Sequence, residues 1–227
     1  MSIRFKLLLT VLLMSASKIV YAQSQTRVGL LPTVNYNHKI NKDWDINFRF
    51  ESRHFVFENN TPESSNFKYE YSLSDISVLV ARKAGLNSKF VLGVLTRLEP
   101  DAVAYRTIQQ FIFQTKIKSF RLVHRIATDQ TFSSNEATEF RLRYRVSAEI
   151  PLSGQKLDVK EFYFKFNTEV LNGVQDNVYD LEFRLVPNIG YVINKQHKIE
   201  LGLDNRLDSF IDNQTRLVSW ITVNWFL

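Results

Sequence analysis

Four histidines are the residues of this sequence best suited to act as general bases. A histidine beside a serine can activate the hydroxyl as a nucleophile, which would suit cleavage of an acyl ester. Three of them fall on the apolar side of an alternating pattern, and the fourth lies in a short turn. Ser133 and Ser134 lie in a polar connection and belong to no recognisable nucleophile motif. Such positions favour interfacial histidines over catalytic ones; the four are His38, His54, His124 and His197.

Acidic residues offer two further chemistries. Glu200 and Asp204 could do acid–base work, but pairing with Arg206 is the simpler interpretation. The short stretches DNV and IDN could touch calcium weakly. The sequence has no cysteine, and it has no HExxH motif, EF-hand loop or glycine-rich phosphate loop. It therefore predicts no catalytic constellation, no cofactor and no metal site.

The stretch EFRLRYRVSAEI, residues 139–150, shows the pattern that dominates the chain. Apolar residues occupy every second position, and Arg141, Arg143 and Arg145 alternate with them. Successive side chains of a strand point to opposite faces. One face of this strand is therefore apolar, and the other carries three cations.

The first 22 residues read as a secretory signal peptide, with a basic start, a short apolar run and a small-residue site ending at Ala22. Removing residues 1–22 takes away three of the 29 basic residues, which leaves 26 against 23 acidic ones. A nearly balanced, exported chain is not expected to bind nucleic acid. The remaining residues, 23–227, form one domain without an apolar run long enough for a membrane helix, so a membrane role would require a closed β-barrel.

Period-2 alternation runs through the whole domain and predicts an all-β fold, a single antiparallel up-and-down transmembrane barrel. Each expected strand is long enough to cross a bilayer, and a bulge is expected near Ser74-Asp75, where the apolar parity changes. Eleven candidates are found, whereas bacterial barrels usually have an even number. Either residues 23–40 form two strands bent at Pro32, giving 12, or ten strands close and 28–40 lies partly in the lumen. The candidates are 28–40, 44–57, 67–82, 89–99, 104–117, 119–132, 137–150, 157–171, 178–193, 198–210 and 215–227.

The connections alternate between shorter and longer ones, and short turns are typical of the periplasmic side of a barrel. This predicts a periplasmic-side aromatic girdle at Trp44 and Trp225. The outer-side girdle is expected at the residues that flank the longer connections. Its members are Phe55, Tyr105, Phe132, Phe140 and Tyr179.

The charged face carries both signs, so neighbouring strands can pair their charges within a narrow lumen. Pairing across residues 133–137 would place Asp129 near Arg141 and Arg121 near Glu149. We therefore expect the apolar face to contact outer-membrane lipid and the charges to form a polar network in the lumen. The predicted network is Arg49, Arg53, Arg121, Arg125, Asp129, Arg141, Arg143, Arg145, Glu149, Glu161, Lys165, Glu182, Arg184, Asp204 and Arg206.

Four arginine- and aromatic-bearing stretches resemble, in this order, the outer-membrane family called domain of unknown function 2490. The resemblance covers residues 26–227 and implies a small barrel in the outer membrane of a Gram-negative bacterium, with no established activity. The stretches are WDINFRFESR (44–53), LVHRIATDQTF (122–132), EFRLRYRVSAEIPL (139–152) and KEFYFKFNTEVL (160–171).

The last strand would serve recognition by the barrel-insertion machinery, although the chain ends in Leu227 rather than in an aromatic residue. Protein partners are not predictable. The leading hypothesis is a structural or interaction barrel with a salt-bridge-filled lumen and no catalysis. The alternatives are a narrow or transport-assisting pore, a lipid-modifying enzyme, and a soluble periplasmic barrel that binds an apolar ligand.

Overall fold

A computed structural model describes residues 25–59, 65–117, 120–134, 136–154, 156–209 and 216–227. The predicted signal peptide, 1–22, lies outside this part of the chain. None of the described residues forms a helix long and apolar enough to cross a membrane. The described strands are β1 (Gln25–Lys39), β2 (Trp44–Asn59), β3 (Ser65–Lys83), β4 (Ser88–Leu98), β5 (Val103–Ile117), β6 (Phe120–Ser133), β7 (Glu139–Pro151), β8 (Phe162–Gln175), β9 (Val178–Val192), β10 (Lys198–Asp208) and β11 (Arg216–Phe226).

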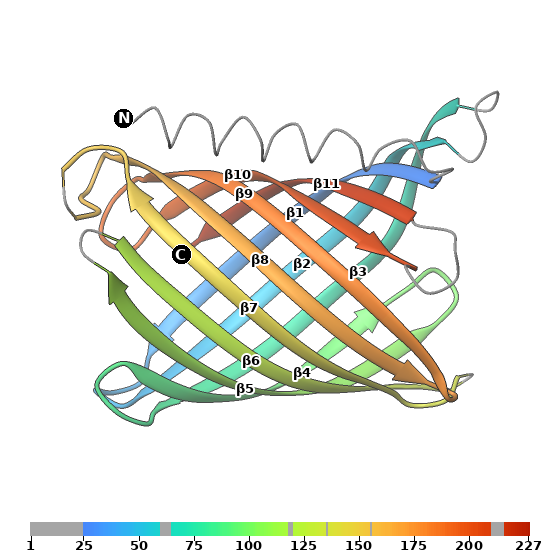
Figure 1. Cartoon of the computed structure of the whole chain (residues 1–227), viewed down its shortest axis with the longest axis horizontal. Helices are drawn as coiled ribbons and strands as arrows, with labels where there is room; N and C mark the ends of the chain where they lie inside the picture. The colour runs from blue at the N-terminus through green and yellow to red at the C-terminus, as the bar shows by residue number, and fades with distance from the viewer. Residues whose placement is uncertain (1–24, 60–64, 118–119, 135, 155, 210–215) are drawn as a thin grey trace, which may run out of the picture.

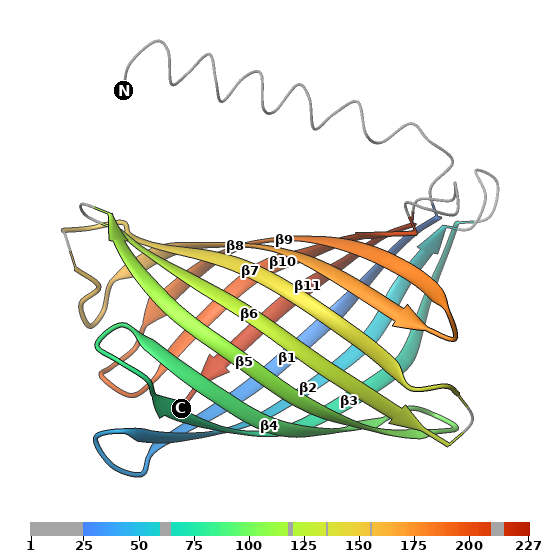
Figure 2. The same ribbon diagram turned by 60° about the horizontal axis from the view of Figure 1, so that its bottom comes forward.

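These strands form one closed barrel (Figures 1 and 2), in which each strand pairs with its neighbours in the sequence. All of these neighbours are antiparallel, and the barrel closes where β1 pairs with β11 in parallel. The predicted all-β transmembrane barrel is confirmed. The eleven strands of the described residues fall between the two expected counts, so the expected fully antiparallel arrangement fails at this one seam.

Strand β1 is a single strand that continues through Pro32. The described part of residues 23–40 therefore neither forms two strands bent at Pro32 nor lies in the lumen, the two arrangements that were expected. Leu31, Pro32 and Thr33 pair in register with residues 222–224 of β11. On the β2 side, Leu30 and Thr33 have paired partners and Pro32 has none, so the missing N–H of Pro32 removes little from the β1–β2 hydrogen bonding. Backbone hydrogen bonds between β1 and Leu227, 2.8 and 3.1 Å long, extend the seam to the last residue.

The barrel has two rims, which we call the N-terminal rim, where β1 and β11 begin, and the C-terminal rim, where they end. The connections do not divide into short and long sets as expected. The link between β7 and β8, at the C-terminal rim, spans 152–161. At the N-terminal rim, where longer connections were expected, β8 and β9 are joined by a tight turn of Asp176 and Asn177, both with positive φ. Connection length therefore does not assign either rim to the periplasm.

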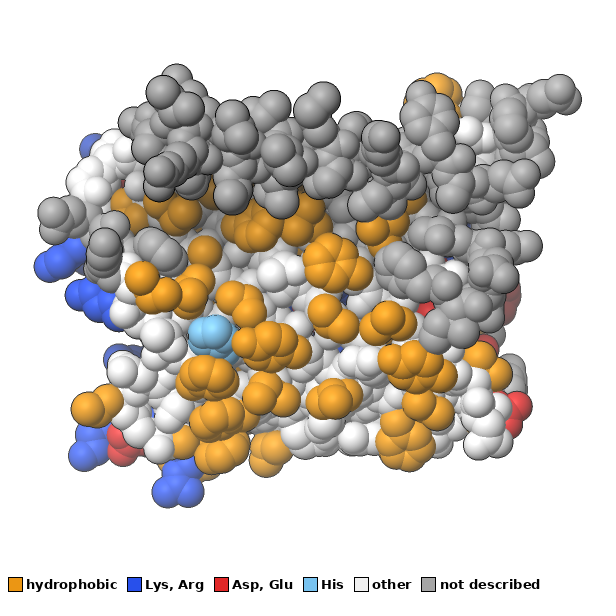
Figure 3. All heavy atoms as spheres, viewed as in Figure 1, with side chains coloured by type: hydrophobic (Ala, Val, Ile, Leu, Met, Phe, Trp, Pro, Cys, Tyr) orange, Lys and Arg blue, Asp and Glu red, His pale blue; other side chains and the backbone are white. Residues whose placement is uncertain are grey.

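The outward face is largely apolar, as expected for a surface in contact with lipid. Hydrophobic side chains spread over the middle of the face in Figure 3, and charged ones gather toward the two ends. On β10, for example, Leu201 and Leu203 are exposed, whereas Glu200 and Asp204 are buried. Alternation along each strand thus separates a lipid-facing surface from a charged lumen.

One irregularity shifts the alternation of β3. Arg53 pairs with Leu73 and His54 with Tyr71, so Ser72 is the extra residue of a bulge. The bulge lies two residues before the expected position at Ser74-Asp75. It changes the parity of β3, as predicted, because the extra residue turns every later side chain to the other face.

The lumen also contains apolar side chains. Leu31, Val218 and Trp220 form a buried cluster near the N-terminal rim. Phe55 packs against Trp220 with ring centroids 4.6 Å apart, and the Trp220 ring lies over Gly29. Phe55 therefore does not belong to the expected outer-side girdle. The alternation of β2 explains the difference, because Phe55 shares the odd, lumen-facing positions of Arg49, Glu51 and Arg53.

Candidate functional site

A cavity of about 500 Å³ occupies the middle of the lumen, and all eleven described strands contribute to its lining. Sixteen of the thirty lining residues are charged. The charges come from the alternate positions that the sequence assigns to the lumen. This cavity and the ion pairs around it are the candidate functional site.

Two carboxylates anchor the arginines of β5 to β9. Asp129 is fully buried, and its oxygens lie 2.6 Å from both Arg141 Nη2 and Arg143 Nη2. Arg106 Nε lies 3.5 Å from the same carboxylate. Three guanidinium groups therefore share one negative charge.

Glu169, only 1% exposed, is contacted by four arginines. Arg125 Nη2 lies 2.6 Å from it, Arg145 donates a short hydrogen bond, and Arg143 and Arg184 approach to 3.8 Å. Arg143 thus links Asp129 to Glu169. The two carboxylates and their arginines form one connected cluster across five strands, β5 to β9.

The opposite wall carries a second cluster. Glu51, 5% exposed, accepts hydrogen bonds from Arg49 and Arg53. Arg97 donates to both oxygens of Asp75, from Nε and from Nη2, each at 2.8 Å, which is the bidentate geometry that arginine favours. Arg206 on β10 interacts electrostatically with Glu51 across the intervening β11 and β1. Arg206, which pairs with Asp204, therefore extends the second cluster to β10.

A third group surrounds Glu200, which is 2% exposed. Lys165 Nζ lies 2.9 Å from its carboxylate, the Tyr163 hydroxyl donates to it at 2.7 Å, and Lys198 approaches to 3.7 Å. The Tyr163 ring lies over Gly190 of the next strand, where a Cβ would collide with it. This close approach explains a glycine at that position.

Most of the predicted network residues lie in the lumen and form ion pairs. The hairpin register is as expected, since Asp129 pairs with Arg141 and Arg121 with Glu149. Arg121 itself is exposed near the C-terminal rim. The residues found in ion pairs are Arg49, Arg53, Arg125, Asp129, Arg141, Arg143, Arg145, Lys165, Glu182, Arg184, Asp204 and Arg206.

Glu161 differs from its predicted position. The expected strand from residue 157 begins only at Phe162, because Lys160 has a positive φ of 66° and turns the chain. Glu161 therefore lies in the β7–β8 connection, where its carboxylate accepts the backbone N–H of Asp158 at 3.4 Å. It belongs to a turn rather than to the lumen network.

Sequence reasoning left out several members of the network, and six of them are central to the three groups described above. Three of them share the parity of predicted members on the same strand, and this signal could have identified them. The other three lie on strands whose alternation is less regular. The six are Glu51, Glu169 and Glu200, followed by Asp75, Arg97 and Arg106.

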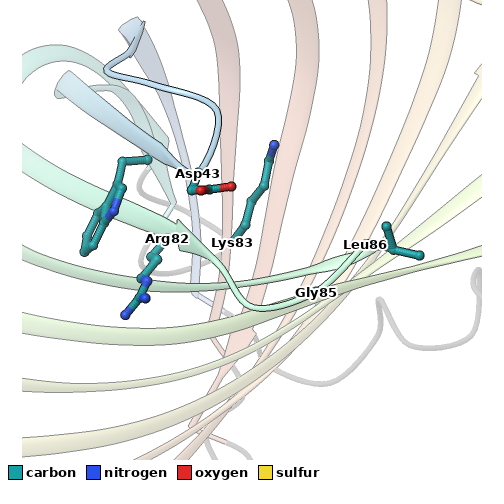
Figure 4. Close-up of a pocket in the computed structure, with 6 residues that line it drawn as sticks. Asp43, Arg82, Lys83, Gly85 and Leu86 are labelled. Atoms are coloured by element: carbon teal, nitrogen blue, oxygen red, sulfur yellow. The ribbon is translucent and has the colours of Figure 1, made fainter.

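The remaining predicted girdle residues lie on the outward face. Trp44 and Trp225 are exposed near the C-terminal rim, and Tyr105, Phe132, Phe140 and Tyr179 are exposed toward the N-terminal rim. The Arg82 guanidinium lies 5.5 Å from the Trp44 ring. Trp44 and Arg82 line a second cavity of about 530 Å³ at the C-terminal rim, between the turn after β1 and the turn after β3. Asp43, Lys83 and Leu86 also line it (Figure 4).

Polar side chains also occur on the outward face, and they occur in hydrogen-bonded groups. Thr107, Gln109, Thr128 and Gln130 bond to one another across β5 and β6. His124 bonds to the Tyr144 hydroxyl at 2.9 Å. Lipid offers no hydrogen-bond partners, so these side chains satisfy their donors and acceptors by bonding to one another.

A further outward group joins β2 and β3 beside the bulge. Ser52 Oγ lies 2.8 Å from His54 Nε2, and His54 Nδ1 lies 2.8 Å from the Tyr69 hydroxyl. Ser74 Oγ lies 3.1 Å from Ser52 Oγ. Sequence reasoning considered His54 as a base but not Ser52, although residues two apart on one strand share a face and this spacing could have identified the pair.

The other candidate residues lie apart from these groups. His38 is near the C-terminal rim and stacks on Tyr36, and His197 lies in the turn before β10. Ser133 ends β6, and Ser134 is exposed beyond it. The described residues contain no group of three or more histidines and acids that could hold a metal ion.

Fold and lumen together define a transmembrane β-barrel. The chain belongs to the family described as "Protein of unknown function (DUF2490)", which matches residues 29–216. Among solved structures the chain is similar to LpxR from Salmonella typhimurium, with a TM-score of 0.50 and 10% sequence identity. That match covers 81% of this chain and 83% of LpxR, and at this identity it shows the fold alone. No curated protein sequence matches the chain.

Proposed function

We propose that the protein is an outer-membrane barrel of Gram-negative bacteria, exported by a cleaved signal peptide, whose ion-paired lumen is closed to ion flow. Its function on this proposal is structural or interactive rather than transport. The apolar outward belt and the family membership support the outer-membrane location.

The low exposure of the lumen carboxylates supports closure. Asp129, Glu169 and Glu51 are at most 5% exposed. In a water-filled channel such carboxylates would be hydrated, but here guanidinium groups surround them. Ion pairs of this kind hold side chains across neighbouring strands and leave little room for a continuous water column.

Single-channel recording in planar bilayers tests the closed lumen. The purified barrel is expected to give no stable current at neutral pH, whereas a variant that removes bulky lumen side chains, Arg143→Ala with Arg184→Ala, should conduct or flicker. The matched control is Lys68→Ala with Lys89→Ala, two cations outside the lumen network. A stable open current from the unmodified protein would favour the narrow-pore alternative.

A second candidate function, a lipid acyl hydrolase, is favoured by the Ser52–His54–Tyr69 hydrogen-bond chain. Ser52 would attack an ester carbonyl while His54 takes the hydroxyl proton and returns it to the leaving alcohol. Water would then release the fatty acid from Ser52. Ser52 is only 7% exposed, and this ranks the candidate second.

Release of fatty acid from short-chain phospholipids in mixed micelles tests this candidate. Ser52→Ala and His54→Ala should each abolish release, and His124→Ala, which changes another outward histidine bonded to a tyrosine, should leave it unchanged. No release by the unmodified protein, or release that survives Ser52→Ala, would remove the candidate.

A further inference from the structure

Cations outnumber carboxylates in the lumen. Eleven lining residues are arginine or lysine, and five are aspartate or glutamate. Asp129 and Glu169, which hold lining arginines from the wall, raise the carboxylates to seven. Adding the peripheral Glu139 and Lys198, which contact Arg141 and Glu200, raises both totals by one. Glu149, which interacts electrostatically with Lys165, adds one more carboxylate, so cations exceed carboxylates by three among the described cavity-lining residues and these partners.

An uncompensated charge in a narrow lumen is costly, and several like charges together are more so. Sharing makes the excess visible, since four arginines approach Glu169 and three approach Asp129. Both of these carboxylates are therefore already engaged by several guanidinium groups. An anion from solution would supply the missing charge.

Three lining cations keep accessible surface. The side chain of Arg49 is 40% exposed, that of Arg145 28% and that of Lys165 22%. All three line the 500 Å³ cavity, and each already contacts one carboxylate. Their remaining N–H groups can donate to a ligand in the cavity.

The chemistry of the lining selects the class of ligand. Guanidinium groups match the planar oxygens of phosphate and carboxylate groups and bind them in pairs. More than half of the lining residues are charged, which disfavours an acyl chain and hence a lipid headgroup with its tails. The cavity volume lies in the range of ordinary small-molecule sites.

We propose that the lumen cavity binds a soluble, multivalent oxyanion of the phosphate class, held by Arg49, Arg145 and Lys165. This inference builds on the closed lumen proposed above, because the anion would complete the charge balance of a space that does not conduct. The bound anion would stabilise the fold, since it binds the folded barrel and not the unfolded chain.

Inorganic pyrophosphate is the probe for this site. The full barrel, folded in detergent micelles, is titrated by calorimetry at constant ionic strength, and its unfolding midpoint is followed by tryptophan fluorescence. We expect saturable binding and a rise in the midpoint, weaker effects with sulfate, and none with sodium chloride at the same ionic strength. Soluble dihexanoyl phosphatidic acid, which adds short tails to a phosphate, should bind less tightly than pyrophosphate.

Variants locate the site. Arg145→Gln and Arg49→Gln should each weaken pyrophosphate binding about tenfold or more, as expected for one lost charge-assisted contact. Lys68→Gln removes an exposed cation that pairs with Glu70 outside the cavity, and it should bind like the unmodified protein. If Arg145→Gln fails to fold, Arg49→Gln and Lys165→Gln carry the test.

Two results would overturn the inference. One is an equal response to pyrophosphate and chloride at matched ionic strength, and the other is equal binding by Arg49→Gln, Arg145→Gln and Lys68→Gln. Conductance of the same preparation separates this failure from failure of the closed lumen. A current together with specific pyrophosphate binding overturns closure alone, and absent binding without a current overturns the anion site alone.

Discussion

Individual carboxylates hold the lumen together, because each one is shared by several arginines. Glu169 shows this most clearly, with four guanidinium groups around a nearly inaccessible side chain. Replacing it by glutamine removes the negative charge while keeping the shape. We expect Glu169→Gln to lower the free energy of unfolding by about 3–5 kcal/mol, as when one partner of a buried ion pair is removed.

Urea-induced unfolding in lipid vesicles, followed by tryptophan fluorescence, measures this effect. The control is Glu70→Gln, which removes an exposed carboxylate paired with Lys68, and its cost should stay below about 1 kcal/mol. If Glu169→Gln unfolds no more easily than Glu70→Gln, the shared carboxylate does not stabilise the barrel.

At the scale of elements, the closing strands depend on a close approach. Gly29 on β1 pairs with Trp220 on β11, and the indole ring lies over the glycine. A Cβ at residue 29 would also meet the backbone oxygen of His54 at 2.6 Å. Gly29→Ala should therefore cost about 1–3 kcal/mol by overpacking the seam.

The same vesicle assay tests the seam. Gly173→Ala is the matched control, because a Cβ on that strand glycine would meet its nearest atoms at 3.8–3.9 Å. The control should change stability by less than Gly29→Ala. Equal losses for the two variants would mean that the Trp220 contact has no special role.

How far the elements follow from the sequence depends on their regularity. Strand β7 was predictable nearly to its ends, because its apolar and basic residues alternate without interruption. Phe55 was placed on the wrong face, because its position beside a connection was given more weight than the parity that it shares with Arg49 and Arg53. Glu161 was misplaced for a different reason, because Lys160 adopts a left-handed conformation and delays the start of β8. A one-residue bulge inside a strand is visible in a period-2 pattern, as the parity change of β3 was, whereas a turn residue at the end of a strand is not.

Across the whole molecule, closure was the feature that the sequence could not decide. Alternation gave eleven strands but contained no information about which edges meet. An odd number of strands makes the first and last run in the same direction, so the barrel can close only through a parallel pair. The contacts of Ser52 and His54 with Ser74 and Tyr69 depend on the register of β2 against β3, which alternation does not give either.

Crosslinking tests the parallel seam directly, because the chain has no cysteine of its own. Thr33 and Asn224 are partners across β1 and β11, and paired residues of neighbouring strands lie within the Cα separation that a disulfide needs. Thr33→Cys with Asn224→Cys should therefore crosslink on oxidation of the folded barrel and shift its mobility on denaturing gels. The control, Thr33→Cys with Gly202→Cys, places the second thiol on β10, one strand beyond the partner, and should crosslink far less. A ten-stranded barrel with β1 in the lumen, or a twelve-stranded barrel with an antiparallel seam, would not favour the first crosslink over the control. Equal crosslinking of the two pairs would therefore contradict the parallel closure.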